Sequence, residues 1–73
     1  MNNNNVKIKD STSFLHCFFF GADAYSADKI DRQVEAFVIQ SCLDYKLIEE
    51  ITQGGKRLYH ILPEGRKIIC NKQ

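Results

Sequence analysis

The sequence of 73 residues lacks tryptophan, has one proline and contains no apolar run near the roughly 18 residues that a membrane span requires. Its first residues, MNNNN, lack the apolar core of a secretory signal. A chain of this size buries only about 60% of its unfolded surface, so a partner chain would add to its stability. We therefore expect one soluble, cytoplasmic domain that does not enter a membrane.

Ligand-binding and catalytic motifs are also missing. The side chains that could bind zinc show no C-x-x-C or H-x-x-x-H spacing. They are His16, Cys17, Cys42, His60 and Cys70. No phosphate-binding glycine loop is present, and no nucleophile has an evident base. We expect no metal, cofactor, disulfide or catalysis, and Cys17 as a redox-sensing thiol is the alternative role for a cysteine.

The net charge does not indicate a partner. Ten Lys and Arg residues against nine Asp and Glu residues leave a formal charge of +1. A dedicated nucleic-acid binder usually has a clear cationic excess. Any contact with nucleic acid must therefore come from a local concentration of cations.

The N-terminal part divides into a tail and an extended segment. Residues 1–5 are an Asn-rich stretch that we expect to be disordered, so that residues 6–73 form the single domain. Residues 6–9 alternate apolar and cationic side chains. This alternation favours a short edge strand or an extended arm.

A first helix is expected to run to about Phe20 and to end at Gly21. Its N-cap oxygens would come from Asp10, Ser11 or Ser13. Three consecutive phenylalanines, residues 18–20, cannot all face one core, because successive helical residues point about 100° apart. At least one of these rings needs another cover.

The middle of the chain, residues 27–46, contains no Gly or Pro and is expected to be one long helical segment. Ser26 is its expected N-cap, and a break near Asp31 could divide it into two helices. The apolar stripe with three- and four-residue spacing is the expected core face. It consists of Ile30, Val34, Phe37, Val38, Ser41 and Tyr45.

A second apolar stripe lies on nearly the opposite side of this helical segment. It consists of Ala36, Ile39, Leu43 and Leu47. A helix that is apolar on two sides must be covered on both. The second cover is either the chain's own N-terminal segment or hairpin, or a second copy in a homodimer.

The C-terminal part predicts a hairpin and a last helix. Residues 47–52 and 56–62 have the composition of strands, and Gln53-Gly54-Gly55 joins them. Glycines adopt the positive φ angles that tight hairpin turns demand. Pro63 cannot donate within a strand ladder but suits the first turn of a helix, so a short helix should follow the hairpin.

This C-terminal part, YKLIEEITQGGKRLYHILPEGRKII, resembles the wing of bacterial winged-helix regulators of the MarR and PadR kind. In those families the recognition helix ends in a Gly-Leu-Ile step, and the hairpin closes with Tyr-x-Leu-Thr-x-x-Gly. Residues 46–48 and 59–65 match these patterns, with Lys46 in place of the Gly and Leu62 in place of the Thr. The likeness covers about residues 30–69 and implies an α+β fold, a small winged helix of three to four helices with a C-terminal hairpin wing.

The resemblance also implies a homodimeric transcriptional regulator that binds double-stranded DNA through its third helix and its wing. The implied DNA contacts are Ser26, Lys29, Arg32 and Gln33 at the start of the long helical segment and Lys56 and Arg57 on the wing, with Lys7 and Lys9 as further contacts. Acidic residues on the same surface would repel phosphates. They are Asp28, Asp31, Glu35, Glu49 and Glu50.

A winged-helix module that binds protein without DNA is the alternative, such as a subunit of a larger assembly or a factor of a phage or mobile element. Contiguous exposed apolar surface marks such an interaction site. The expected dimer or partner interface consists of Phe18, Phe20, Ala36, Ile39 and Leu43. Strong salt dependence of binding would favour DNA, and complex formation without nucleic acid would favour protein.

Overall fold

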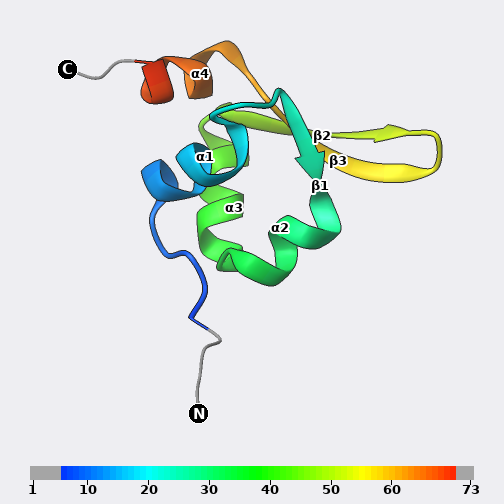
Figure 1. Ribbon diagram of the computed structural model, residues 1–73, viewed down its shortest axis with the longest axis horizontal. Coiled ribbons are helices and arrows are strands. Elements are labelled where there is room, and N and C mark those ends of the chain that lie inside the picture. Colours follow the sequence, from blue (N-terminus) through cyan, green and yellow to red (C-terminus); the bar gives the residue numbers. More distant parts are fainter. Residues whose placement is uncertain (1–5, 71–73) are drawn as a thin grey trace.

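A computed structural model describes residues 6–70, and the predicted disordered tail, residues 1–5, lies outside this range (Figure 1). The described chain has an α+β fold, as the sequence predicts. Its elements are α1 (Ser11–Phe19), β1 (Ala24–Ser26), α2 (Ala27–Gln33), α3 (Ala36–Asp44), β2 (Ile48–Gln53), β3 (Lys56–Ile61) and α4 (Pro63–Cys70). No helix within residues 6–70 has the length and apolar character that crossing a membrane demands.

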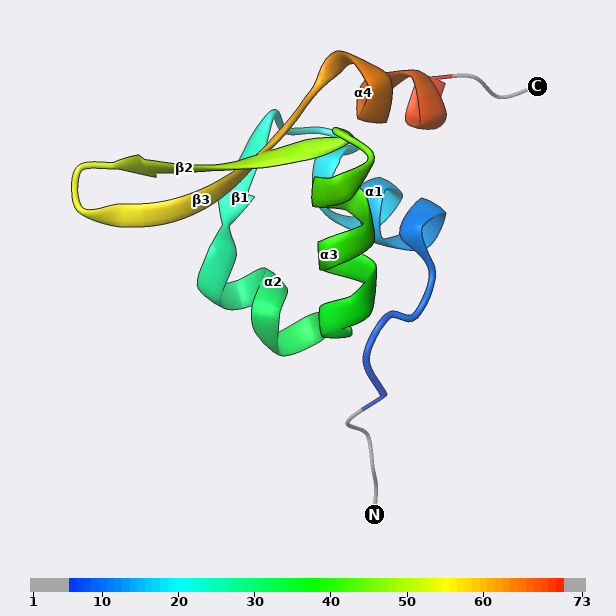
Figure 2. The same cartoon turned by 180° about the vertical axis from the view of Figure 1, so that it is seen from behind.

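The three strands form an antiparallel sheet in the order β1-β3-β2. The predicted hairpin is confirmed, with Gln53 paired to Lys56 across a turn in which Gly54 and Gly55 have φ angles of 59° and 80°. Positive φ at both turn residues matches the right-handed twist of the strands. The tip of this hairpin extends beyond the body formed by α1, α2 and α3 (Figures 1 and 2). The sequence did not predict β1, because this strand pairs with β3, which lies far along the chain. Tyr25 lies opposite Tyr59 in this pairing.

Helix α1 provides the largest side chains of the core. The Asp10 side chain caps it by accepting a 2.9 Å hydrogen bond from the Ser13 amide, which lowers the pKa of the Asp10 carboxyl. Phe14 is fully buried and packs edge-on against both Phe18 and Phe19. Phe20 is 71% exposed, which agrees with the expectation that the three consecutive phenylalanines cannot share one core.

The helical segment predicted over residues 27–46 is divided into two helices, which is the alternative that the sequence left open, but the break lies at Val34 and Glu35 rather than near Asp31. Both residues have extended ψ angles, 137° and 142°. The N-terminal arm occupies the break: the Ile8 amide donates to the Gln33 carbonyl and the Glu35 amide donates to the Ile8 carbonyl, each at 2.9 Å. The alternating segment thus forms the expected arm, in a single parallel bridge between Ile8 and Val34.

This break changes which residues face the core. Ile30, Val34 and Val38 are buried as predicted, but Phe37 and Tyr45 are 61% and 75% exposed. Because the predicted stripe assumed one continuous helix, its C-terminal half was placed on the wrong side. Helix α3 instead buries two other side chains, Ile39 and Cys42. The complete buried apolar core is Phe14, Leu15, Phe18, Phe19, Ala27, Ile30, Val34, Val38, Ile39, Cys42, Ile48, Tyr59, Ile61 and Ile69.

Helix α3 ends in a Schellman motif that has a lysine where glycine is usual. The Leu47 amide donates to the Cys42 carbonyl at 2.8 Å, and the Lys46 amide donates to the Leu43 carbonyl at 3.2 Å. Lys46 has a φ of 63°, in the left-handed region. Glycine is usual at such a position, because it adopts a positive φ without the steric cost of a Cβ.

Helix α4 returns the chain to the helical body, where it packs against α1. Arg66 donates to the backbone carbonyls of Phe19 at 2.7 Å and Ala22 at 3.2 Å, and forms an ion pair with Asp23. These contacts fix the connection between α1 and β1. Gly65 is buried where α4 meets the segment between α3 and β2, with no room for a larger residue.

Gly65→Ala should lower the free energy of unfolding by about 1–3 kcal/mol, because its Cβ would collide with the Leu47 carbonyl oxygen and lie 2.9 Å from Ile61 Cγ1. The same change usually stabilises a helix. Denaturant unfolding measures the effect, with Gly21→Ala as control. A Cβ at Gly21 meets no atom within 4 Å, so that variant should stay within about 0.5 kcal/mol of the parent. Equal stability of both variants would contradict this packing.

Lys46→Gly should raise the free energy of unfolding by about 0.5–1 kcal/mol, since glycine avoids the cost of a left-handed residue but loses more chain entropy. Gln40→Gly, at an exposed position inside α3, should instead lower it by about 0.5–1 kcal/mol. The same denaturant unfolding distinguishes the two variants. A loss of stability in Lys46→Gly would exclude the left-handed C-terminus of α3.

Candidate nucleic-acid interface

Arg57, a predicted phosphate contact on the wing, is held by carboxylates of its own chain. Its Nε donates to Glu50 Oε2 at 2.9 Å, and its Nη1 lies 3.4 Å from Asp28 Oδ1 and 3.5 Å from Asp31 Oδ2. The hydrogen bond with Glu50 raises the pKa of the Arg57 guanidinium above its usual value. We call these four residues the Arg57 cluster. Arg57 therefore links the hairpin to α2 through carboxylates of its own chain.

Tyr59 lies beneath the Arg57 cluster at the edge of the core. Its hydroxyl accepts a 3.3 Å hydrogen bond from Arg57 Nη2 and lies 3.5 Å from Asp31 Oδ1, to which it can donate. The ring is buried, and this burial, more than the nearby carboxylate of Asp31, raises the pKa of the Tyr59 hydroxyl. The buried ring thus anchors a polar cluster at the surface.

Helix α2 carries acidic and basic side chains on two adjacent stripes. Asp28 and Asp31 are three residues apart and therefore lie on one side of the helix, where both contact Arg57. Lys29 and Arg32 have the same spacing and form the neighbouring stripe. Neither of these cations forms an ion pair with a carboxylate anywhere in the described part of the chain. The expectation that acidic residues on this surface would repel phosphates did not take this separation of the two stripes into account.

Lys56, at the start of β3, adds a cation to the basic stripe of α2 from the hairpin. Side chains alternate between the faces of a strand, so Lys56 points away from the face that carries Arg57 and Tyr59. It shares its face with Leu58, which is paired to Ser26 at the end of β1. Like Lys29, Lys56 has no carboxylate partner among residues 6–70.

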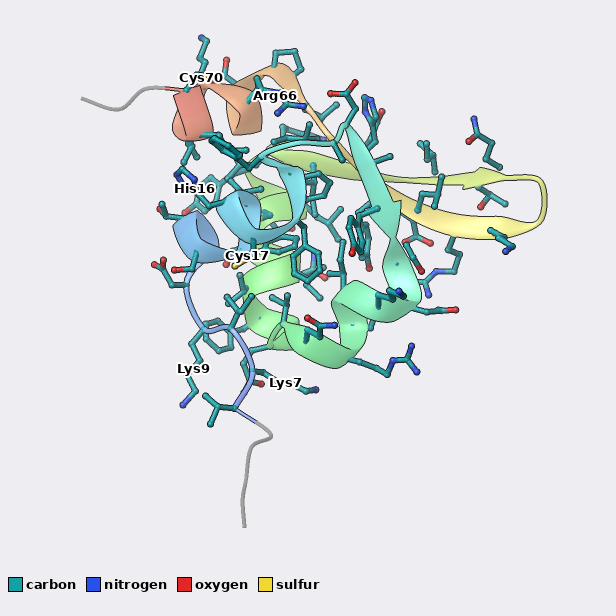
Figure 3. The ribbon with its side chains drawn as sticks, viewed as in Figure 1. Lys7, Lys9, His16, Cys17, Arg66 and Cys70 are labelled. Carbon is teal, nitrogen blue, oxygen red and sulfur yellow. The ribbon has the colours of Figure 1, made fainter. Side chains whose placement is uncertain are left out.

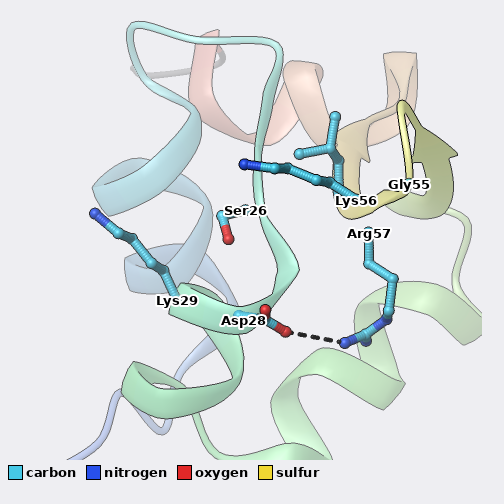
Figure 4. A pocket seen from close by; sticks show the side chains of 7 residues that line it. Ser26, Asp28, Lys29, Gly55, Lys56 and Arg57 are labelled. Atoms are coloured by element: carbon cyan, nitrogen blue, oxygen red, sulfur yellow. Dashed lines mark hydrogen bonds and ion pairs between the residues drawn. The ribbon is translucent and has the colours of Figure 1, made fainter.

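Lys29 and Lys56 line a hollow of about 470 Å³ between the start of α2 and the hairpin (Figure 4). Ser26, Asp28, Gly55 and Arg57 complete most of its wall. In Figure 4 both lysine side chains extend away from the contact between Asp28 and Arg57. The hollow is thus lined by two lysines that have no carboxylate partner among residues 6–70, while its one acidic side chain, Asp28, contacts Arg57.

The N-terminal arm places two further cations near the end of α2. Lys7 and Lys9 flank Ile8, which is paired to Val34 directly after the helix. Both lysines lie on the arm, far from Arg66 and α4 (Figure 3). The predicted additional contacts therefore adjoin the end of α2 that carries Arg32.

Helix α3 does not carry the DNA contacts that were predicted at the start of the long helical segment. Arg32 and Gln33 end α2, because the helix breaks directly after them. The exposed side chains of α3 include Phe37, Gln40 and Asp44, and the helix contains no Lys or Arg. The candidate phosphate contacts thus lie on α2, the arm and the hairpin. The exposed surface of α3 carries apolar, polar and acidic side chains but no cation.

The predicted partner interface is divided by the fold. Phe18 and Ile39 are only 7% and 6% exposed within the single chain, so they belong to its core and cannot contact a partner without unfolding. Leu43 is half-buried, while Phe20 and Ala36 are exposed. Two exposed aromatic rings, Phe37 on α3 and Tyr45 directly after it, were assigned to the core by the sequence pattern. Their exposure could have been predicted only if the position of the helix break had been known.

The candidate metal ligands do not converge. Within residues 6–70, no group of three or more His, Cys, Asp or Glu side chains could hold a metal ion. Cys42 is buried, and burial raises the pKa of its thiol, whereas Cys17 and Cys70 are exposed. His16 stacks on Phe20 with ring centroids 6.1 Å apart.

Comparison of the chain with protein-family models, with curated proteins and with solved structures finds no match. The functional argument therefore depends on the geometry of the chain itself.

Arg57→Gln should lower the melting temperature by an amount on the order of a few degrees at low salt, because the hairpin loses its link to α2 and three carboxylates lose their counter-ion. The difference from the parent protein should shrink in about 1 M NaCl, where exposed charges are screened. Lys56→Gln removes the same charge from the neighbouring position and should change the melting temperature little. Equal effects of the two substitutions, or an effect that salt does not alter, would contradict the Arg57 cluster.

Proposed function

We propose that this protein is a small winged-helix module that binds double-stranded DNA, and that it acts as a homodimeric regulator of transcription. The element order α1-β1-α2-α3-β2-β3-α4 and the sheet order β1-β3-β2 support the winged-helix assignment. In this assignment the hairpin of β2 and β3 is the wing. The fold alone does not imply DNA binding, so the argument depends on the charged surface.

The observation that carries the proposal is the separation of charges on and beside α2. The Arg57 cluster gathers three carboxylates on one side. Lys29, Arg32 and Lys56 remain without carboxylate partners on the other side, within the part of the chain that is described. Cations of this kind neutralise phosphates and release counter-ions, which supplies most of the affinity for a nucleic-acid backbone.

The small number of these cations supports the proposal of a homodimer. Three unpaired side chains per copy, with two more on the arm, supply only a modest phosphate-binding surface. A two-fold dimer presents the same surface twice, at positions that match two half-sites on a duplex. Dimerisation would therefore compensate for the net charge of only +1.

A protein-binding module is the second candidate, and the surface of α3 favours it. Phe37 and Tyr45 are 61% and 75% exposed, and no cation lies on this helix. Exposed aromatic rings are enriched in the centres of protein interfaces. This surface could serve either homodimer contact or a different protein.

Lys29→Gln and Arg32→Gln should each weaken binding to a duplex, and each should reduce the slope of log affinity against log salt by about 0.9, since each removes one phosphate contact. Fluorescence anisotropy at several salt concentrations measures both quantities. Lys67→Gln is the matched control, because Lys67 lies on α4 and is paired with Glu64. The same slope for the Lys29, Arg32 and Lys67 variants would remove α2 from the interface.

A further inference from the structure

The hollow between α2 and the hairpin has the features of a binding site for a compact anion. Its volume of about 470 Å³ lies within the range of roughly 300–1,000 Å³ that is usual for small-ligand sites. Its walls come from two segments far apart in the sequence, residues 26–29 and 55–58. The geometry points to a phosphate group as the ligand, held between the ammonium groups of Lys29 and Lys56 and the hydroxyl of Ser26.

Charge is the first argument for a phosphate. Two unpaired ammonium groups in one concavity repel each other, and a bound anion removes this repulsion. The one carboxylate in the wall, that of Asp28, lies 3.4 Å from Arg57 Nη1. Arg57 is held in turn by Glu50 at 2.9 Å. Asp28 thus contacts Arg57 while its side chain stays 82% exposed, whereas the two lysines have no carboxylate partner in residues 6–70.

The hydrogen-bonding groups supply the second argument. Ser26 precedes α2, yet its side chain makes no capping hydrogen bond, so its hydroxyl is free to donate. Gly55 has no atom within 4 Å of the place where a Cβ would stand, so a ligand can approach the backbone closely there. A phosphate has enough acceptor oxygens for two lysines and one hydroxyl, and Lys29, Lys56 and Ser26 all line the hollow.

A carboxylate fits this hollow less well. Planar carboxylates are best recognised by the paired N–H groups of an arginine, and the arginine in this wall is already bound to Glu50, Asp28 and Asp31. Lysine ammonium groups act as point charges that suit the rounder phosphate. Phosphate is therefore the better match among common biological anions.

This inference deepens the proposed function, because Lys29 and Lys56 belong to the proposed DNA-binding surface, but it can be tested without DNA. The phosphate could come from the nucleic-acid backbone or from a small phosphorylated molecule. Both sources share the chemistry that the hollow recognises.

The test is a titration of the full chain with inorganic phosphate, followed by ¹⁵N–¹H NMR at constant ionic strength. We expect saturable shifts of the amides of Ser26, Lys29, Gly55 and Lys56. Lys29→Gln and Lys56→Gln should each weaken the apparent affinity by about fivefold or more, since each removes a charge-assisted hydrogen bond. Lys67→Gln should leave it unchanged, and the spectrum of each variant shows directly whether it is folded.

The outcomes separate this inference from the proposed function. Absence of saturable shifts, or equal weakening by Lys56→Gln and Lys67→Gln, would overturn the phosphate site even if DNA binds elsewhere. If a duplex displaces inorganic phosphate, the hollow holds a backbone phosphate. If the duplex binds without displacing it, or does not bind at all, while phosphate still binds at these residues, the ligand is a small phosphorylated molecule. Failure of the duplex to bind, with phosphate still bound at these residues, would remove the DNA-binding proposal and leave the phosphate site in place.

Discussion

The ion-pair cluster around Arg57 is the constraint on which the surface of this protein depends. One guanidinium on the hairpin contacts carboxylates of β2 and α2, and so fixes the hairpin beside α2. The buried ring of Tyr59 supports the cluster from within the core. The same contacts decide which charges remain available. Three of the acidic side chains, Asp28, Asp31 and Glu50, contact Arg57. Lys29 and Lys56 line the neighbouring hollow and have no carboxylate partner among residues 6–70.

The second constraint is the bridge between Ile8 and Val34. By inserting between α2 and α3, the arm ends one helix and reorients the next. As a result, Lys29 and Arg32 lie on α2, while Phe37 is exposed on α3 and Tyr45 directly after it. The pairing of Ile8 with Val34 therefore separates the cations of α2 from the exposed aromatic rings that follow the helix break. In the function proposed above, nucleic-acid binding and self-association would therefore use different surfaces.

Local features were predictable from the sequence, and non-local ones were not. Gly54-Gly55 marks the hairpin turn, and Asp10 marks the start of α1, because both signals act within a few residues. The helix break at Val34 depends on a partner 26 positions earlier, Ile8, and β1 depends on β3. The arrangement of the candidate site was not predictable for the same reason: its residue types were identified, but the contacts of Arg57 with α2 cross 26 to 29 positions and could not be read from spacing.

The most direct test of the account is to map amide shifts on addition of a short DNA duplex by ¹⁵N–¹H NMR. We expect the largest shifts at Lys29, Arg32 and Lys56, with smaller ones on the arm around Ile8, and little change at Phe37 and Tyr45. Shifts confined to Phe37, Tyr45 and their neighbours on α3, or no shifts at low salt, would contradict the claim that the separation of charges beside Arg57 creates the binding surface.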